Sequence, residues 1–159
     1  MLNVLFLCTD SSMRSIVAEA ILRGSGGGRF RGFSAGCSPV PALDREVVEF
    51  LRERHLPVDG LRPRSWTEFT RPDAPQLAFV IALSAPAAAL ADEQLWPGDP
   101  VVAHWNLDAD DPEVERSVWE IRDTFWVLSR RIKIFTSLPH GKTSRHTLER
   151  RLHALEAWQ

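Results

Sequence analysis

The residues best suited to chemistry stand near the amino end of the chain, in the stretch VLFLCTDSSMRSIVAEAIL. Cys8 ends a short apolar run, and Arg14 follows six residues later, where a helical pattern begins. A cysteine acts as a nucleophile in its thiolate form, which loop amides and a helix N-terminus stabilise by lowering the thiol pKa. An arginine holds two oxygens of a tetrahedral oxyanion in a planar fork. The pattern therefore predicts an anion pocket with a reactive thiol at its base, unless Cys8 is only a small buried core residue.

Alternating strands and helices are expected to position this loop. Short apolar runs predict four strands, at residues 2–7, 31–36, 79–83 and 101–105. Helical periodicity marks residues 14–22, 43–56, 114–135 and 144–158, and an alanine-rich helix is expected after the third strand. A capping box is expected at Ser65, with Glu68 reaching back to it. This alternation predicts an α/β fold with a parallel sheet, in which ligands bind at the carboxyl ends of the strands, where Cys8 lies.

Composition narrows the classes of protein to consider. The chain has 159 residues, which suits one domain, and a net charge of -2, which argues against nucleic-acid binding. Two cysteines exclude a disulfide scaffold, and no signal peptide or membrane-length apolar segment is seen, so a cytoplasmic protein without a membrane partner is expected. The five histidines show no ligand spacing with cysteines or carboxylates, and we therefore predict no metal.

The loop sequence resembles the low-molecular-weight protein tyrosine phosphatase family, and most closely its arsenate reductase branch. The loop of that branch typically reads V-L-F-x-C-x-G-N-S-x-R-S-x-x-A-E-A. Further matching segments follow in order, namely FSAGCSPVPALDREVVEFLRERHLPVDGLRPRSWTEF, FVIALS, AHWNLDADDPE and IRDTFWVLSRRI. The resemblance implies a flavodoxin-like fold (the phosphotyrosine phosphatase I fold), a single domain whose four parallel strands lie in the order 2-1-3-4 with helices on both faces. We expect this domain to span residues 1–137, and residues 138–159 to be a C-terminal extension with an extra helix.

The resemblance also assigns roles to residues of this sequence. Cys8 matches the nucleophile, Arg14 the arginine that binds the oxyanion, and Ser15 the hydroxyl that bonds the thiolate. Ser34 matches a serine that supports the loop. The oxyanion-binding loop would consist of Thr9, Asp10, Ser11, Ser12, Met13, Arg14 and Ser15. Its amides are expected to lower the pKa of the Cys8 thiol, so that Cys8 and not Cys37 is the reactive cysteine.

Asp111, directly before Pro112, matches the general acid of an Asp-Pro motif. The same pair is typical of a helix N-cap followed by proline at the first helical position, and both roles are compatible. Asp108 and Asp110 are nearby substitutes for the acid.

Several positions depart from the family pattern. Asp10 stands where the family has glycine, and its carboxylate is expected to repel an incoming dianion. Ser11 replaces an asparagine, which tolerates a left-handed backbone better than serine does. Ser84 stands near the first relay cysteine of the reductases, and no second thiol follows it. Glu113 follows Pro112, where the phosphatases usually carry a tyrosine.

Three functions remain open at this point. The first is an arsenate reductase-like enzyme, in which the second thiol comes from an external reductant such as glutathione with glutaredoxin, or thioredoxin. Cys37 is the internal alternative to that reductant. The second is a low-molecular-weight phosphatase acting on a phosphorylated substrate through a cysteinyl-phosphate. The third is an oxyanion-binding module without turnover. No tightly bound cofactor is expected, the small partner is arsenate or phosphate, and the protein is expected to be a monomer or a homodimer.

Overall fold

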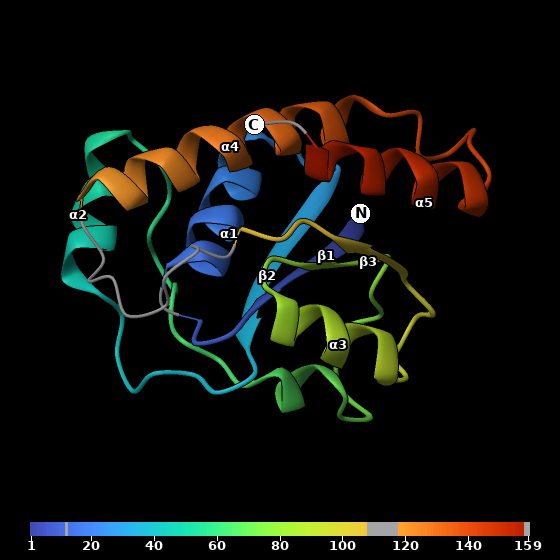
Figure 1. Cartoon of the computed structure of the whole chain (residues 1–159), viewed down its shortest axis with the longest axis horizontal. Coiled ribbons are helices and arrows are strands. Elements are labelled where there is room, and N and C mark those ends of the chain that lie inside the picture. Colours follow the sequence, from blue (N-terminus) through green and yellow to red (C-terminus); the bar gives the residue numbers. More distant parts are fainter. Residues whose placement is uncertain (12, 108–117, 158–159) are drawn as a thin grey trace.

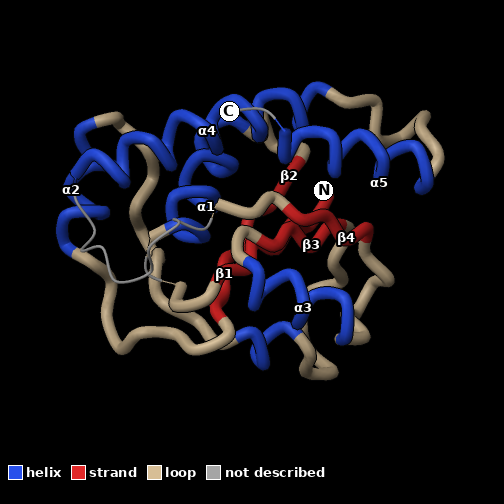
Figure 2. The backbone as a smooth tube through the Cα atoms, viewed as in Figure 1, coloured by secondary structure: helices blue, strands red, loops and turns tan. Residues whose placement is uncertain are grey.

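The sheet has four parallel strands in the predicted order. The computed structural model describes residues 1–11, 13–107 and 118–157. The strands are β1 (Leu2–Cys8), β2 (Phe30–Gly36), β3 (Phe79–Ala82) and β4 (Val101–His104), and they lie in the order β2-β1-β3-β4 (Figure 2). All three neighbouring pairs are parallel, which confirms the expected topology. Residues 4–8 of β1 and the whole of β3 are buried, as expected for strands that helices cover on both faces.

Helices cover both faces of this sheet. They are α1 (Arg14–Ser25), α2 (Arg45–Glu53), α3 (Ala85–Glu93), α4 (Val118–Ser137) and α5 (Arg145–Ala154), with short 3₁₀ turns η1 (Trp66–Phe69) and η2 (Leu155–Ala157). Figure 1 shows α1, α4 and α5 on one side of the sheet and α3 on the other. The single α/β domain predicted from the sequence is therefore confirmed.

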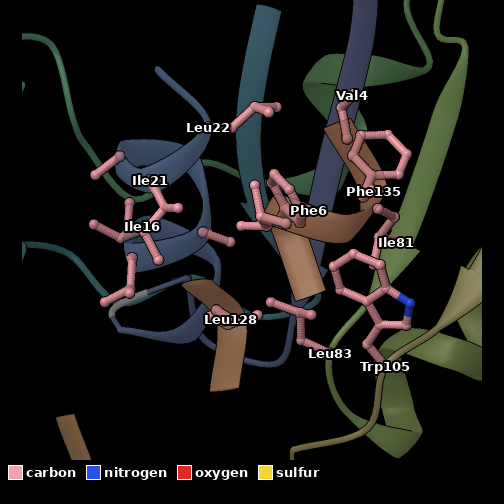
Figure 3. Close-up of a cluster of buried hydrophobic side chains, with 14 of the residues drawn as sticks. Val4, Phe6, Ile16, Ile21, Leu22, Ile81, Leu83, Trp105, Leu128 and Phe135 are labelled. Carbon is pink, nitrogen blue, oxygen red and sulfur yellow. The ribbon is translucent and has the colours of Figure 1, made fainter. Parts of the chain in front are cut away.

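Alternate residues of β1 divide between two hydrophobic clusters. Val4, Phe6 and Cys8 belong to the larger cluster, together with side chains from α1, α2, α4 and α5. Figure 3 shows Val4 and Phe6 in this cluster beside side chains of α1 and α4. Leu5 and Leu7 face the smaller cluster beside α3 and η1. Because successive side chains of a strand point to opposite faces, this division fixes the face on which the Cys8 thiol lies.

The C-terminal helix docks on its own sheet. Leu148 and Leu152 of α5 are buried in the larger cluster. The indole N–H of Trp105, just after β4, donates to the Leu152 carbonyl at 2.8 Å. The apolar face of α5 is therefore used within the same chain.

The Ser65 segment differs from the expected capping box. Ser65 begins only the short turn η1: its Oγ accepts from the amide of Thr67, two residues on, and Glu68 pairs with Arg62 at 3.0 Å. The expected capping box is therefore wrong, because Arg62 draws the Glu68 carboxylate away. None of the helices that the structure describes is long and apolar enough to cross a bilayer.

Candidate active site

The Cys8 thiol lies at the carboxyl end of β1, facing the first turn of α1. Its Sγ is 3.0 Å from Oγ of Ser15, to which the thiol donates, and the amide of Ser11 donates to Sγ at 3.2 Å. The thiol is almost fully buried, with 1% of the residue exposed. The hydroxyl of Ser15 rotates to donate once the thiol has lost its proton. These two groups place hydrogen-bond donors around a thiolate at this position.

The segment that follows β2 holds the loop backbone in place. The amide of Cys37 donates to the carbonyl of Cys8 at 3.0 Å, which extends the ladder between β1 and β2 by one residue. The amide of Ser38 donates to the carbonyl of Thr9 at 2.8 Å, and the amide of Val40 to that of Asp10 at 2.9 Å. Three successive carbonyls of the 8–10 segment are thus satisfied by one neighbouring chain segment.

Gly36, at the end of β2, lets the loop approach this strand closely. A Cβ added at Gly36 would lie 2.8 Å from the amide nitrogen of Ser11 and 3.0 Å from its Cβ. A real Cβ does not approach backbone atoms this closely, so a side chain here would displace the loop. The Gly36 amide donates to the carbonyl of Arg64 at 2.9 Å.

Ser11 adopts the left-handed conformation expected at this position, with a φ of 54°. Its hydroxyl oxygen accepts from the amide of Arg64 at 3.4 Å, while its own amide points at the Cys8 sulfur. A left-handed backbone is unfavourable for a serine, and the contacts with Arg64 and Cys8 offset that cost. Ser12 lies outside the described residues.

A buried carboxylate connects α1 to the segment that carries Arg64. Glu19 is fully buried, and its carboxylate lies 3.0 Å from Nη1 of Arg64 and 3.3 Å from Nη2 of Arg23. The Ser34 hydroxyl donates to the same carboxylate at 3.5 Å. The structure therefore places Ser34 against Glu19, which contacts Arg64, whose amide in turn donates to the Ser11 hydroxyl of the loop.

The roles of Glu19 and Arg64 were missed in the sequence. Glu19 itself could have indicated a buried ion pair, because a single charged residue in an otherwise apolar helical run must find a partner or stay neutral. Burial raises the pKa of Glu19, while the two arginines and the hydrogen bonds from Arg64 and Ser34 act against that rise. Arg64 lies 45 residues away in the sequence, so its pairing with Glu19 had no local signature.

Arg14 is the first residue of α1, beside the loop. Its Nη2 lies 3.9 Å from Oε1 of Glu120 in α4, and both side chains are partly exposed. The Thr9 hydroxyl is 2.9 Å from that of Ser84, whose Oγ also accepts from the amide of Ala87 at the start of α3. Ser84, at the position near the first relay cysteine, thus serves as a helix cap.

The predicted general acid lies outside the described residues. Asp111, its substitutes Asp108 and Asp110, and the neighbouring Pro112 and Glu113 all fall in the segment 108–117. Within the described part of the chain, no three histidine, cysteine or acidic side chains are grouped so that they could hold a metal ion.

The pKa of the Cys8 thiol differs from the expectation. Burial raises the pKa above its ordinary value, and the nearby negative charge of Asp10 raises it further. Hydrogen bonds from Ser15 and from the amide of Ser11 lower the pKa but do not outweigh burial. The expected depression of the thiol pKa was wrong, because the expectation counted the hydrogen-bond donors and left out the loss of water around the buried sulfur.

The two cysteines lie on opposite faces of the sheet, and neither forms a disulfide. Cys8 belongs to the cluster beside α1 and α4. Cys37 continues the alternation of Phe33 and Ala35 and packs against the cluster beside α3. Adjacent backbones bring the two residues close, but their side chains point apart, which is unfavourable for a disulfide.

A family model and solved structures match this chain. The model described as low molecular weight phosphotyrosine protein phosphatase matches residues 3–135. A low molecular weight protein tyrosine phosphatase from T. tengcongensis has 25% identity and a TM-score of 0.66, and the match covers 87% of this chain and all of that one. An arsenate reductase from Archaeoglobus fulgidus has 22% identity and a TM-score of 0.64, with 85% of this chain and 99% of that chain covered.

A third similar structure is the thioredoxin-dependent arsenate reductase of Corynebacterium glutamicum. It has 23% identity and a TM-score of 0.62, with 85% of this chain and 60% of that chain covered. No curated protein sequence matches this chain closely enough to count as a relative. The family match covers more than half of the chain and includes the whole Cys8 loop.

Proposed function

We propose, since the chain belongs to the low molecular weight phosphotyrosine protein phosphatase family, that it is an enzyme whose Cys8 thiolate attacks the central atom of a tetrahedral oxyanion. The finer proposal is that this oxyanion is arsenate and that an external thiol supplies the electrons. The observation that carries the common chemistry is the Cys8 sulfur between the Ser11 amide and the Ser15 hydroxyl, at the start of α1. Donors fixed in this way stabilise both a thiolate and the charge that develops on attack.

The first step forms a covalent bond to Cys8. The thiol proton passes to an oxygen of the bound anion, and the thiolate attacks arsenic while one oxygen leaves as water. The guanidinium of Arg14 and the loop amides hold the remaining oxygens. Because burial raises the pKa of Cys8, we expect a proton to be transferred within the complex. We propose Asp111 as the acid that protonates the leaving oxygen.

The second step reduces arsenic. An external thiolate attacks Sγ of Cys8, the sulfur–arsenic bond breaks, and its electron pair remains on arsenic, which leaves as arsenite. Cys8 is left in a mixed disulfide with the external thiol. A second external thiol then attacks the sulfur of the first, which returns Cys8 as a thiolate and releases an external disulfide. An external thiol is favoured over Cys37, because Cys37 packs on the other face of the sheet.

The second candidate is a phosphatase, in which water hydrolyses a cysteinyl-phosphate. The observation in its favour is that, among the described residues, no further thiol lies on the Cys8 face of the sheet. Water needs no such partner, so a phosphatase would use this site without a second protein or a reductant.

The test measures both activities on one preparation. Wild type, Cys8→Ser and Cys37→Ser are assayed on p-nitrophenyl phosphate, and on arsenate with glutathione–glutaredoxin and with thioredoxin. The reductase proposal predicts arsenite formation by wild type and by Cys37→Ser, none by Cys8→Ser, and a thiol adduct on Cys8 by mass spectrometry. Hydrolysis of the phosphate ester alone would favour the phosphatase. Failure of both reactions under all donors would leave only the oxyanion-binding module.

A further inference from the structure

A basic cavity lies along the open edge of β2, away from the Cys8 loop. Its volume is about 310 Å³, and its walls include Arg23, Arg31, Gly32 and Arg64. β2 is an edge strand of the sheet, with β1 as its only strand neighbour in the described sheet. Gly32 stands four residues before Gly36, which touches the loop, so the Gly32 backbone lies about 13 Å from that contact at ~3.3 Å per residue. We call it the β2-edge cavity.

The charges around the β2-edge cavity do not balance. Arg23 and Arg64 form ion pairs with Glu19 alone, among the described residues, and Arg31 forms none. Arg23 also donates to the carbonyl of Asp59 at 2.6 Å and Arg64 to that of Gly60 at 3.3 Å. In the part of the chain that the structure describes, the lining of the cavity thus holds three arginines and no carboxylate, and Glu19 is the one carboxylate paired with them. Arg31 lies over the ring of Phe33 at 5.1 Å, an arrangement that leaves its N–H groups available. A ligand with two negative charges would neutralise the excess, which is the complementarity that favours binding.

The backbone adds a donor to the same cavity. The amide of Leu2 donates to the carbonyl of Arg29, and the amide of Cys37 donates to the carbonyl of Cys8. The peptide groups of Arg29 and Cys37 therefore point toward β1. Because this direction alternates from one residue to the next along a strand, the odd-numbered residues of β2 point toward β1 as well. The N–H and C=O of Gly32 therefore point toward the open edge, where Gly32 lines the cavity. An N–H between guanidinium groups is the arrangement that recognises oxyanions.

We propose that the β2-edge cavity binds a dianionic oxyanion, either inorganic phosphate or the phosphate group of a monoester. The guanidiniums of Arg23, Arg31 and Arg64 hold its oxygens, with the Gly32 amide at the strand edge. The site is separate from the Cys8 loop and does not depend on the proposed function. Arg31 is the residue to test, because it touches neither Glu19 nor the loop, whereas Arg64 contacts both.

Isothermal titration calorimetry with inorganic phosphate counts the sites. We expect two sites on wild type, one of which is lost in Arg14→Ala and the other in Arg31→Ala. Arg71→Ala, at an exposed arginine outside the cavity, is the matched control and keeps both. In the Arg14→Ala background, we expect Arg31→Ala to weaken phosphate binding about tenfold or more, since charge-assisted hydrogen bonds are the strong ones. A failure of the loop to bind phosphate would leave the Arg31-dependent site intact, so the two proposals fail separately.

Phenylphosphonate, a monoester mimic that resists hydrolysis, distinguishes the two sources of the phosphate group. Arg31-dependent binding of both compounds supports a site for phosphate monoesters, and binding of inorganic phosphate alone supports a site for the free ion. Amide chemical shifts in NMR spectra locate the site: shifts at Gly32 and Arg31 are expected in Arg14→Ala. A single site on wild type that Arg31→Ala does not weaken would overturn the proposal. So would Arg14→Ala protein that binds no phosphate, or whose phosphate binding Arg31→Ala leaves unchanged.

Discussion

At the scale of single residues, burial and hydrogen bonding act on the Cys8 thiol in opposite directions. Burial and the charge of Asp10 favour the protonated thiol, while Ser15 and the amide of Ser11 favour the thiolate. Burial is the largest of these contributions, so the pKa of the Cys8 thiol lies above its ordinary value. Asp10 stands where the family has glycine, and a single substitution removes its charge.

Asp10→Asn removes a negative charge beside the site and keeps the size of the side chain. We expect phosphate to bind about tenfold more tightly, because a change of ~1.4 kcal/mol corresponds to a factor of ten. The measurement is calorimetric titration with phosphate in the Arg31→Ala background, so that only the loop site is read. Asp73→Asn, at an exposed aspartate, is the control. Unchanged affinity in Asp10→Asn would show that the carboxylate does not act on the bound anion.

The pH dependence of Cys8 alkylation follows from the raised pKa. A thiol with a raised pKa is mostly protonated at neutral pH, so the rate of modification by iodoacetamide should climb through the alkaline range, beyond the ordinary thiol value of 9.0. Asp10→Asn should move this profile toward lower pH, since Asp10 raises the pKa. Peptide mapping separates Cys8 from Cys37. A rate that is already maximal at mildly acidic pH would contradict the account.

At the scale of elements, the loop depends on three segments that pack around it. The segment after β2 satisfies its carbonyls, Gly36 leaves room for its backbone, and Arg64 holds the Ser11 hydroxyl. Glu19 of α1 in turn pairs with Arg64. The catalytic conformation is therefore a property of several elements that meet at the end of β1.

Gly36→Ala tests the close approach of β2 to the loop. The added Cβ would meet the Ser11 amide, so the loop must shift, and we expect a loss of ~1–3 kcal/mol in the free energy of unfolding together with most of the turnover. Gly141→Ala is the matched control, because a Cβ there meets nothing within 4 Å. Urea denaturation and turnover are the measurements. Full activity in Gly36→Ala would show that the loop does not need this contact.

Glu19→Gln tests the buried ion pair. The substitution leaves Arg23 and Arg64 without their carboxylate, and breaking a fully buried ion pair lowers the free energy of unfolding by several kcal/mol. Because Arg23 and Arg64 are partly exposed, we expect a smaller loss of ~2 kcal/mol. Burial raises the pKa of Glu19 above its unfolded value, so its ionisation lowers wild-type stability as pH rises past that raised pKa. The stability loss on substitution should therefore become smaller as the pH rises above 4.5, the ordinary carboxyl value, whereas the exposed Glu53→Gln should show neither effect. A loss that stays the same or grows as the pH rises would contradict this sign.

The sequence predicted the elements better than their contacts. The apolar runs and the i, i+3, i+4 stripes reflect periodicities that a single strand or helix imposes, and β1, α1 and α4 were confirmed. The strand order, which the family resemblance implied, was confirmed as well. The pairing of Glu19 with Arg64 and the role of Gly36 could not be read from the sequence. They depend on which residues the fold brings together across tens of positions, and no local pattern encodes that. The pKa of Cys8 was mispredicted for the same reason, because it depends on burial.

At the scale of the whole molecule, the chain carries a helix beyond the segment that matches the family model. That match ends at residue 135, whereas α5 spans Arg145–Ala154. Trp105 connects α5 to the rest of the domain, since its ring packs in the core and its indole N–H donates to a carbonyl of α5. Trp105 stands six residues before Asp111 in the sequence. The extra helix therefore lies along β4, with Arg145 hydrogen-bonded to the carbonyls of Asp99 and Pro100 before the strand and Leu152 hydrogen-bonded to Trp105 after it.

Leu152→Ala tests how far α5 contributes to the domain. Leu152 is fully buried, and truncating such a leucine typically costs 2–5 kcal/mol, so we expect ~3 kcal/mol. His146→Ala, at an exposed position on the same helix, should cost less than about 0.5 kcal/mol. Urea denaturation gives both values. Equal stability of the two variants would mean that α5 is not part of the folded core.

The central claim is that an oxyanion binds directly over the Cys8 sulfur, and protection from alkylation tests it most directly. Wild-type protein is treated with iodoacetamide at alkaline pH, with and without phosphate or arsenate, and the rates at Cys8 and Cys37 are followed separately by peptide mapping. The account predicts that the anion slows modification of Cys8 several-fold and leaves Cys37 unchanged, because Cys37 faces the other side of the sheet. In Arg14→Ala the protection should be lost. Equal rates at Cys8 with and without the anion, or protection of Cys37 in its place, would contradict the account.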